Sequence, residues 1–138
     1  MSRRILLAYD GSESAQKAFE FALQLLRREG GELAMVAVIR SSEFAVDVGA
    51  QNLIEGACAM LGSEMQRLQR RVQFAGANSS IMIRLGQPAQ QILQAAREWH
   101  ADLIVTGQRA RFSLMRYLGG SVSSQIRARS PCDLRVVR

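Results

Sequence analysis

The chain has 138 residues, of which 48% are hydrophobic, and this length and composition suit one globular domain and exclude a disordered protein. No apolar run approaches the ~20 residues that cross a bilayer, and no signal-cleavage site follows the amino-terminal run, so we expect a cytoplasmic protein without a membrane partner. The net charge is +6, but the basic residues are scattered and aromatic residues make up only 6%, so we do not expect nucleic-acid binding.

The chain opens with a predicted strand and a predicted helix. Residues 4–9 (RILLAY) are almost all apolar, as is typical of a parallel strand covered on both faces. The turn Asp10-Gly11-Ser12 ends this strand, and Ser12 or Ser14 can cap the following helix. That helix ends at Gly30-Gly31, and its apolar stripe consists of Ala15, Ala18, Phe19, Ala22, Leu23 and Leu26.

A second strand–helix pair follows with less distinct boundaries. Residues 32–39 (ELAMVAVI) predict a strand, and residues 40–49 are expected to form a loop of mixed polarity. From about residue 51 to residue 76 we predict a helix, whose apolar seam is formed by Leu61, Met65, Leu68 and Val72.

The last part of the chain repeats this alternation. Residues 79–85 and 103–106 predict two further strands, with a helix between them that begins at Pro88 and buries Ile92, Leu93, Ala96 and Trp99. Residues 118–129 predict a final helix, Pro131 ends it, and residues 134–137 predict a fifth strand. Strands that alternate with helices indicate one α/β domain with a parallel sheet and right-handed crossovers.

The glycines after the first and fourth strands indicate an anion site. Gly107 ends the fourth strand, and Gly120-Ser121 opens the final predicted helix. Glycine lets the backbone approach a ligand closely, and the free N–H groups of a first helical turn favour phosphate. Ligands of open parallel sheets bind beyond the carboxyl ends of the strands, so Asp10 and Gly107 meet there if strands one and four are neighbours.

Each of these residues also has a purely structural interpretation. Asp10 can be a turn former, Gly107 a tight strand exit, and Ser121 a helix cap. The arginines of the loop after Gly107 can add charge near phosphate or remain solvated; they are Arg109, Arg111 and Arg116.

The motifs that several kinds of nucleotide-binding and catalytic site require are absent from this sequence. There is no Walker-type lysine motif, no dinucleotide glycine spacing and no Ser-His-Asp order. The only histidine, His100, ends a helix and is expected to cap it or lie at the surface, while Cys58 and Cys132 are predicted to be buried thiols. We therefore predict a binder without a catalytic residue and without a protein metal centre.

The chain resembles the universal stress protein family over its whole length. The similarity lies in the segments RILLAYDGSESAQKAFEFAL, GQPAQQILQAAREWHADLIVTGQRAR and LGGSVSSQIRARSPCDLRVVR, in this order and spacing. The resemblance implies a three-layer sandwich with a five-stranded parallel sheet in the order 3-2-1-4-5 and helices on both faces. In that order strands one and four are neighbours.

The family resemblance also implies a nucleotide site. Nucleotide-binding members carry G-x2-G-x9-G-[ST] after strand four; Gly107, Gly120 and Ser121 match, whereas Ala110 replaces the second glycine. An alanine held in the left-handed region costs about 1–2 kcal/mol, and little in the right-handed region. The implied ligand is ATP, with Asp10 able to hold Mg2+ through the phosphates. The implied contacts are Ala8, Asp10, Val38, Gly107, Arg109, Ala110, Gly120, Ser121, Val122 and Ser123.

The resemblance further implies a homodimer in a stress-response or signalling role. The fifth strand is an edge strand, and an unpaired edge can pair with a second copy. The expected contacts are Leu134, Arg135, Val136 and Val137, and a monomer with an arginine-guarded edge is the other interpretation.

Two alternative functions stay open. One is a nucleotide-free interaction module whose site is weakened by Ala110, and the other is a small hydrolase in which Asp10 positions a water molecule. The sequence offers no general base, so any ATP hydrolysis is expected to be very slow.

Overall fold

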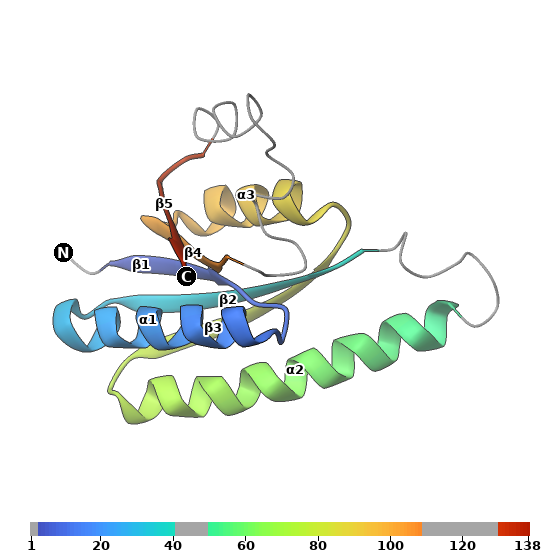
Figure 1. Ribbon diagram of the computed structural model, residues 1–138, viewed down its shortest axis with the longest axis horizontal. Coiled ribbons are helices and arrows are strands. Elements are labelled where there is room, and N and C mark those ends of the chain that lie inside the picture. The colour runs from blue at the N-terminus through green and yellow to red at the C-terminus, as the bar shows by residue number, and fades with distance from the viewer. Residues whose placement is uncertain (1–2, 41–49, 109–129) are drawn as a thin grey trace.

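The computed structural model describes residues 3–40, 50–108 and 130–138, with side chains from residue 52 onward in the second segment. Figure 1 shows an alternation of strands and helices along the chain. The elements are β1 (Arg4–Ala8), α1 (Glu13–Glu29), β2 (Glu32–Ile39), α2 (Ala50–Phe74), β3 (Asn78–Leu85), α3 (Pro88–Trp99), β4 (Leu103–Gly107) and β5 (Asp133–Val137).

The predicted elements are confirmed to within two residues at each end over the described ranges. Residues 41–49 of the loop expected at 40–49, and the helix expected at residues 118–129, lie outside them. No helix of the described part has the length and apolar character needed to cross a membrane.

The strands form one parallel sheet in the order β3-β2-β1-β4-β5, which confirms the predicted topology. β1 lies at the centre, where Leu6 is level with Ala34 of β2 on one side and with Ile104 of β4 on the other. The carboxyl ends of β1 and β4 therefore reach the same edge of the sheet, as the site hypothesis requires.

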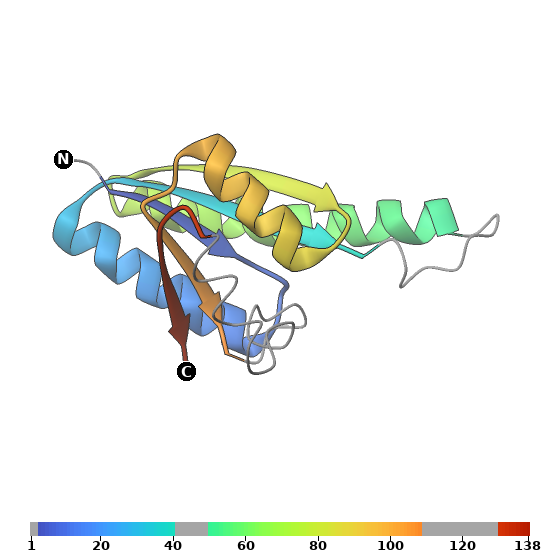
Figure 2. The same ribbon diagram turned by 90° about the horizontal axis from the view of Figure 1, so that it is seen from above.

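Helices cover both faces of the sheet. Figures 1 and 2 show α1 and α2 on one face and α3 on the other. Alternation along each strand sends Ile5 and Leu7 toward α1 and α2, whereas Leu6 and Ala8 pack toward α3. The central strands are buried on both sides for this reason, which explains their near-continuous apolar sequence.

The helix ends follow the signals predicted from the sequence. The Ser12 hydroxyl accepts a hydrogen bond from the Ala15 N–H at 3.1 Å and caps α1, and Gly30 ends this helix with φ of 73°. His100 caps α3 in the left-handed region, with φ of 59°, which confirms its expected capping role.

Arg4 joins four segments at the amino edge of the sheet. Its backbone N–H donates to the Asp102 carboxylate at 2.8 Å, and its guanidinium forms an ion pair with Glu32 at 2.7 Å. Nε and Nη2 of Arg4 both donate to the Trp99 carbonyl, at 3.0 and 2.9 Å, and the guanidinium lies 4.1 Å from the centre of the Trp99 ring. One side chain therefore connects β1, β2 and the end of α3.

We expect Arg4→Ala to lower the free energy of unfolding by about 1–2 kcal/mol, because it removes the carbonyl contacts and the cation–π contact together. Arg4→Lys keeps the charge but cannot donate from two nitrogens to one carbonyl, so it should show a smaller loss. Urea denaturation followed by circular dichroism measures both. Equal stability of the natural chain and both variants would contradict a stabilising role of the Arg4 contacts.

Candidate functional site

The turn after β1 is built around Asp10. Its Oδ1 accepts a hydrogen bond from the Ser12 N–H at 2.9 Å, and Gly11 between them has φ of 82°. The turn-forming role predicted for Asp10 is thus present. The same turn delivers the cap of α1, so one carboxylate aligns the exit of the strand with the start of the helix.

Gly107 lies against the first turn of α1. A Cβ at this position would lie 2.5 Å from the backbone C and O of Ser14 and 2.8 Å from its hydroxyl oxygen. Backbone atoms cannot yield as a flexible side chain can, so only glycine permits this approach. The contact holds the carboxyl end of β4 beside the Asp10 turn, and the two segments predicted to converge do so.

We expect Gly107→Ala to destabilise the fold by about 1–3 kcal/mol, because the added methyl must push α1 away from β4. Gly62→Ala is a matched control, since the nearest atom to its Cβ would be Ile83 Cδ1 at an ordinary 3.7 Å and alanine favours a helix. Thermal unfolding should show a lower Tm for the first variant and an unchanged or higher Tm for the second. An unchanged Tm for Gly107→Ala would rule out the close contact.

A buried hydroxyl precedes this glycine. Thr106 is fully buried, and its Oγ1 has no hydrogen-bond partner within the described part of the chain. Alternation from Ile104 directs the Thr106 side chain toward the α3 face. A buried hydroxyl without a partner costs free energy unless a ligand or water satisfies it.

A cavity of about 530 Å³ opens where α1 begins and β4 ends. Its charged lining includes Lys17, which is the only lysine of the chain, and Arg138 after β5. The full lining is Ser12, Glu13, Ser14, Lys17, Gln108 and Arg138. Ser12 belongs to the candidate turn Asp10-Gly11-Ser12, whereas the other lining residues were not predicted as site residues. The available signal for Lys17 was that it follows the Ser12 cap by little more than one helical turn.

The remaining predicted contacts divide into two groups. Ala8 and Val38 are buried on the α3 face of the sheet, and Val38, at 5% exposure, lies near the carboxyl end of β2. The other group lies outside the described residues and consists of Arg109, Ala110, Gly120, Ser121, Val122 and Ser123.

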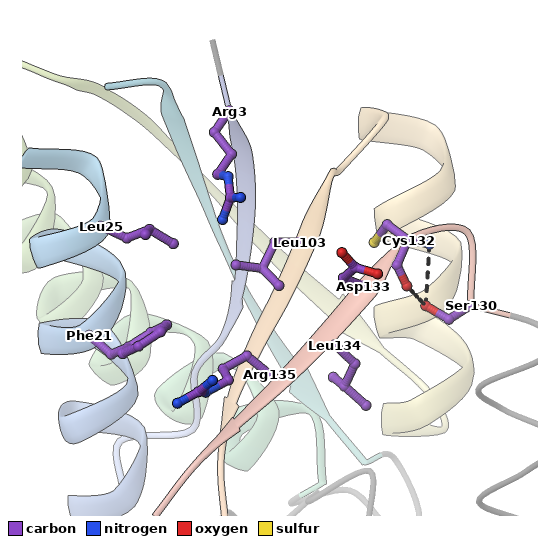
Figure 3. A pocket seen from close by; sticks show the side chains of 9 residues that line it. All are labelled: Arg3, Phe21, Leu25, Leu103, Ser130, Cys132, Asp133, Leu134 and Arg135. Carbon is purple, nitrogen blue, oxygen red and sulfur yellow. Dashed lines mark hydrogen bonds between the residues drawn. The ribbon is translucent and has the colours of Figure 1, made fainter. Parts of the chain in front are cut away.

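A cavity of about 570 Å³ lies at the opposite end of the strands (Figure 3). Arg3, Leu103 and Asp133 place it beside the amino ends of β1, β4 and β5, away from Asp10 and Gly107. Figure 3 shows Arg135 reaching toward α1, where its guanidinium lies 5.1 Å from the centre of the Phe21 ring. The cavity therefore opens on the α1 side of the edge strand and is not the predicted anion site.

In the part of the chain that the structure describes, the thiols and possible metal ligands form no second site. Cys58 and Cys132 are free and only partly buried, which corrects the prediction of buried thiols: Cys58 lies on a helix whose amino-terminal half is largely exposed, and Cys132 precedes an edge strand. Burial raises the pKa of the Cys132 thiol, which keeps it protonated near neutrality. No three metal-ligating side chains gather within residues 3–40, 50–108 and 130–138.

Tyr9 follows β1 on the α1 face, beside a cavity of about 310 Å³ between α1 and α2. Its hydroxyl is buried and has no hydrogen-bond partner among the described residues. The Gln16 side chain lines the same cavity but does not lie in hydrogen-bonding geometry with the Tyr9 hydroxyl. Burial raises the pKa of Tyr9 above its usual value of 10, and the negative charges of Glu64 and Asp10 add to this, while Arg67 opposes it.

A raised folded-state pKa predicts a loss of stability in strong alkali. Below pH 10 the phenol is neutral in both the folded and the unfolded chain, so its ionisation takes nothing from stability. As the pH rises above 10 toward the folded-state pKa, stability falls, because the unfolded chain releases the proton first. Tyr9→Phe should remove this part of the alkaline loss and leave stability at pH 7 equal or higher, since an unpaired hydroxyl disappears. Urea titrations at about pH 7, 9, 10 and 11 measure the free energy of unfolding of the natural chain and of Tyr9→Phe. Parallel pH profiles for the two proteins would contradict the prediction.

The chain matches one known protein family over its whole length. The family model described as "Universal stress protein family" matches residues 1–138. The chain belongs to the universal stress protein family. A universal stress protein of Thermus aquaticus is 31% identical over 140 residues, covering 100% of both chains. A putative universal stress protein of Staphylococcus epidermidis is 31% identical over 139 residues, covering 99% of this chain and 84% of its own.

Solved universal stress proteins share the fold. The protein from Lactobacillus plantarum superposes with a TM-score of 0.81 at 27% identity, covering 99% of this chain and 97% of its own. A universal stress protein in complex with cAMP has a TM-score of 0.69 at 22% identity, covering 99% and 97%. The Archaeoglobus fulgidus protein in complex with dAMP has a TM-score of 0.64 at 18% identity, covering 100% and 98%.

Proposed function

We propose that this universal stress protein binds an adenine nucleotide, ATP with Mg2+, at the carboxyl ends of β1 and β4. The observation that carries the proposal is the contact of Gly107 with the first turn of α1, which brings the Asp10 turn and the β4 exit to one edge. Two solved members of the fold that hold cAMP and dAMP support the same ligand class.

The described residues fit such a ligand in charge and shape. The Asp10 carboxylate can accept hydrogen bonds from ribose hydroxyls, and the packing of Gly107 against Ser14 holds the exit of β4 beside this turn. Lys17 and Arg138 supply positive charge beside this turn. Thr106 presents a buried hydroxyl that gains from a polar partner. Magnesium would come with the phosphates, because no protein cluster in the described ranges could hold it alone.

The site is one for binding, sensing or signalling in the stress response of the cytoplasm, and we propose at most very slow hydrolysis. The described part of the site offers Asp10, Glu13 and Lys17 but no histidine, since His100 lies at the far end of α3. In the described part of the site, only carboxylates can accept a proton from an attacking water, and these have structural roles or contact solvent.

We further propose that the protein dimerises through β5. Within the described sheet this strand pairs only with β4, which leaves its outer edge for a second copy. The open cavity on the α1 side of β5 leaves room for a partner's side chains (Figure 3). The proposed contacts are Leu134, Arg135, Val136 and Val137.

We expect millimolar ATP with Mg2+ to give a measurable heat of binding in titration calorimetry. Asp10→Asn should weaken binding about tenfold, because it removes the charged acceptor while an asparagine oxygen can still accept from the Ser12 N–H. Asp102→Asn is the matched control, since Asp102 also accepts a backbone N–H, at 2.8 Å, but lies at the opposite edge. Absence of heat with the natural chain would refute nucleotide binding.

Ala110→Gly separates this proposal from a nucleotide-free interaction module. If the natural chain retains the site, restoring the glycine should raise ATP affinity by no more than about 30-fold, since a right-handed alanine is nearly harmless and a left-handed one costs about 1–2 kcal/mol. A much larger gain would show that the natural site has been lost.

A further inference from the structure

The outer edge of β5 offers the backbone groups of alternate residues to a partner strand. The Val137 carbonyl accepts a hydrogen bond from the Gln108 N–H at 2.9 Å, so Val137 turns its backbone groups toward β4. Along an extended strand, the N–H and C=O groups of successive residues point to opposite sides. Leu134 and Val136 therefore direct their backbone groups away from β4. A second strand that pairs with this edge would form hydrogen bonds with these two residues.

The side chains of β5 place two opposite charges on one face of the strand. Asp133 and Arg135 lie two residues apart, so their side chains share the α1 face, and Figure 3 shows both on that side. Both are exposed, and neither forms an ion pair within the described part of the chain. The guanidinium of Arg135 instead lies 5.1 Å from the centre of the Phe21 ring. This edge therefore presents an acid and a base to a partner.

Twofold symmetry limits how two copies of β5 can pair. Strands related by a twofold axis perpendicular to the sheet run antiparallel, and each residue lies opposite one whose side chain points to the same face. An axis at Asp133 places two aspartates opposite each other, and an axis at Arg135 does the same with two arginines. An axis at Val136 leaves Asp133 with no residue of the other strand opposite it. Only an axis at Leu134 places Asp133 of each copy opposite Arg135 of the other, and such opposite-charge pairs stabilise a sheet.

We propose that two copies of this chain pair their β5 strands antiparallel about an axis at Leu134, with Asp133 of each copy forming an ion pair with Arg135 of the other. This inference rests on the proposed β5 dimer and adds its register and its preference for a second copy of the same chain. In this register each Leu134 exchanges both outward backbone hydrogen bonds with its counterpart. The charged residues occupy the positions between such bonds, where antiparallel backbones lie closest and side chains meet best.

The surroundings of β5 leave room for this pairing. A cavity of about 570 Å³ adjoins both charged side chains, so the long Arg135 side chain can turn from the Phe21 ring toward Asp133 of the other copy. The axis at Leu134 also places Val136 opposite Cys132 of the other copy. The N–H of Cys132 is bonded only at 3.4 Å, to the Ser130 hydroxyl, so it is available to the Val136 carbonyl of the other copy.

Charge reversal in the full-length chain tests the register, with sedimentation velocity as the measurement. Asp133→Arg and Arg135→Asp should each raise the dimer dissociation constant at least about tenfold, because each replaces attractive pairs by repulsive ones. The double variant Asp133→Arg/Arg135→Asp, and an equimolar mixture of the two single variants, should dimerise within about threefold of the natural chain. The double variant also lacks the contact of Arg135 with Phe21, so its recovery reports on the charge pairs and not on packing against α1.

Arg70→Glu is the matched control, because it reverses an exposed charge on α2 and should leave association unchanged. Equal association of the natural chain and the two single variants would overturn the register, while the dimer itself would stand on another contact. A natural chain that stays monomeric at every concentration would refute the β5 dimer, and this inference with it. Calorimetry with ATP on the same variants reports on the nucleotide site separately.

Cysteine cross-linking locates the axis directly. In a Cys58→Ala/Cys132→Ala background, Leu134→Cys should form a symmetric disulfide-linked dimer on mild oxidation. Its Cα would lie about 5.5 Å from its counterpart, which is within the reach of a disulfide. Arg135→Cys should not cross-link, because in this register its counterpart lies more than about 7 Å away. The reverse result would move the axis to Arg135 and overturn the proposed ion pairs.

Discussion

The contact between β4 and the first turn of α1 governs the candidate site. Position 107 tolerates no Cβ, because the Ser14 backbone occupies the space where one would lie. This single close approach brings together the exit of β4, the Asp10 turn and the capped start of α1. Parallel pairing alone brings the carboxyl ends of β1 and β4 together, but only the missing side chain at position 107 lets the end of β4 approach the backbone of α1.

Polar groups at the two ends of the strands differ in how they are partnered. At the amino ends of the strands, all three guanidinium nitrogens of Arg4 donate hydrogen bonds to Glu32 or Trp99, so the polar groups there stabilise the fold. At the carboxyl edge, Thr106 has a buried hydroxyl without a partner in the described part of the chain, and a cavity lies beside Lys17. Polar groups without partners are where a ligand can add most to stability, which is consistent with the proposed nucleotide site.

Two surfaces of the described chain remain exposed. The outer edge of β5 is unpaired within the described sheet, and the amino-terminal half of α2 presents Leu53 and Met60 to solvent. Each feature is costly for an isolated chain, one through unpaired backbone groups and the other through apolar exposure.

The sequence by itself determined the element order, the helix caps at Ser12 and His100, and the parallel α/β class, because these follow from periodicity and local backbone preferences. It also indicated Asp10 and Gly107. Only the tertiary structure showed that Ser14, Lys17 and Arg138 surround that edge, since their proximity depends on how α1 and β5 pack beside β4. The exposure of Leu53 and Met60 was likewise decided by where the sheet ends beneath α2, a long-range property that no local pattern encodes.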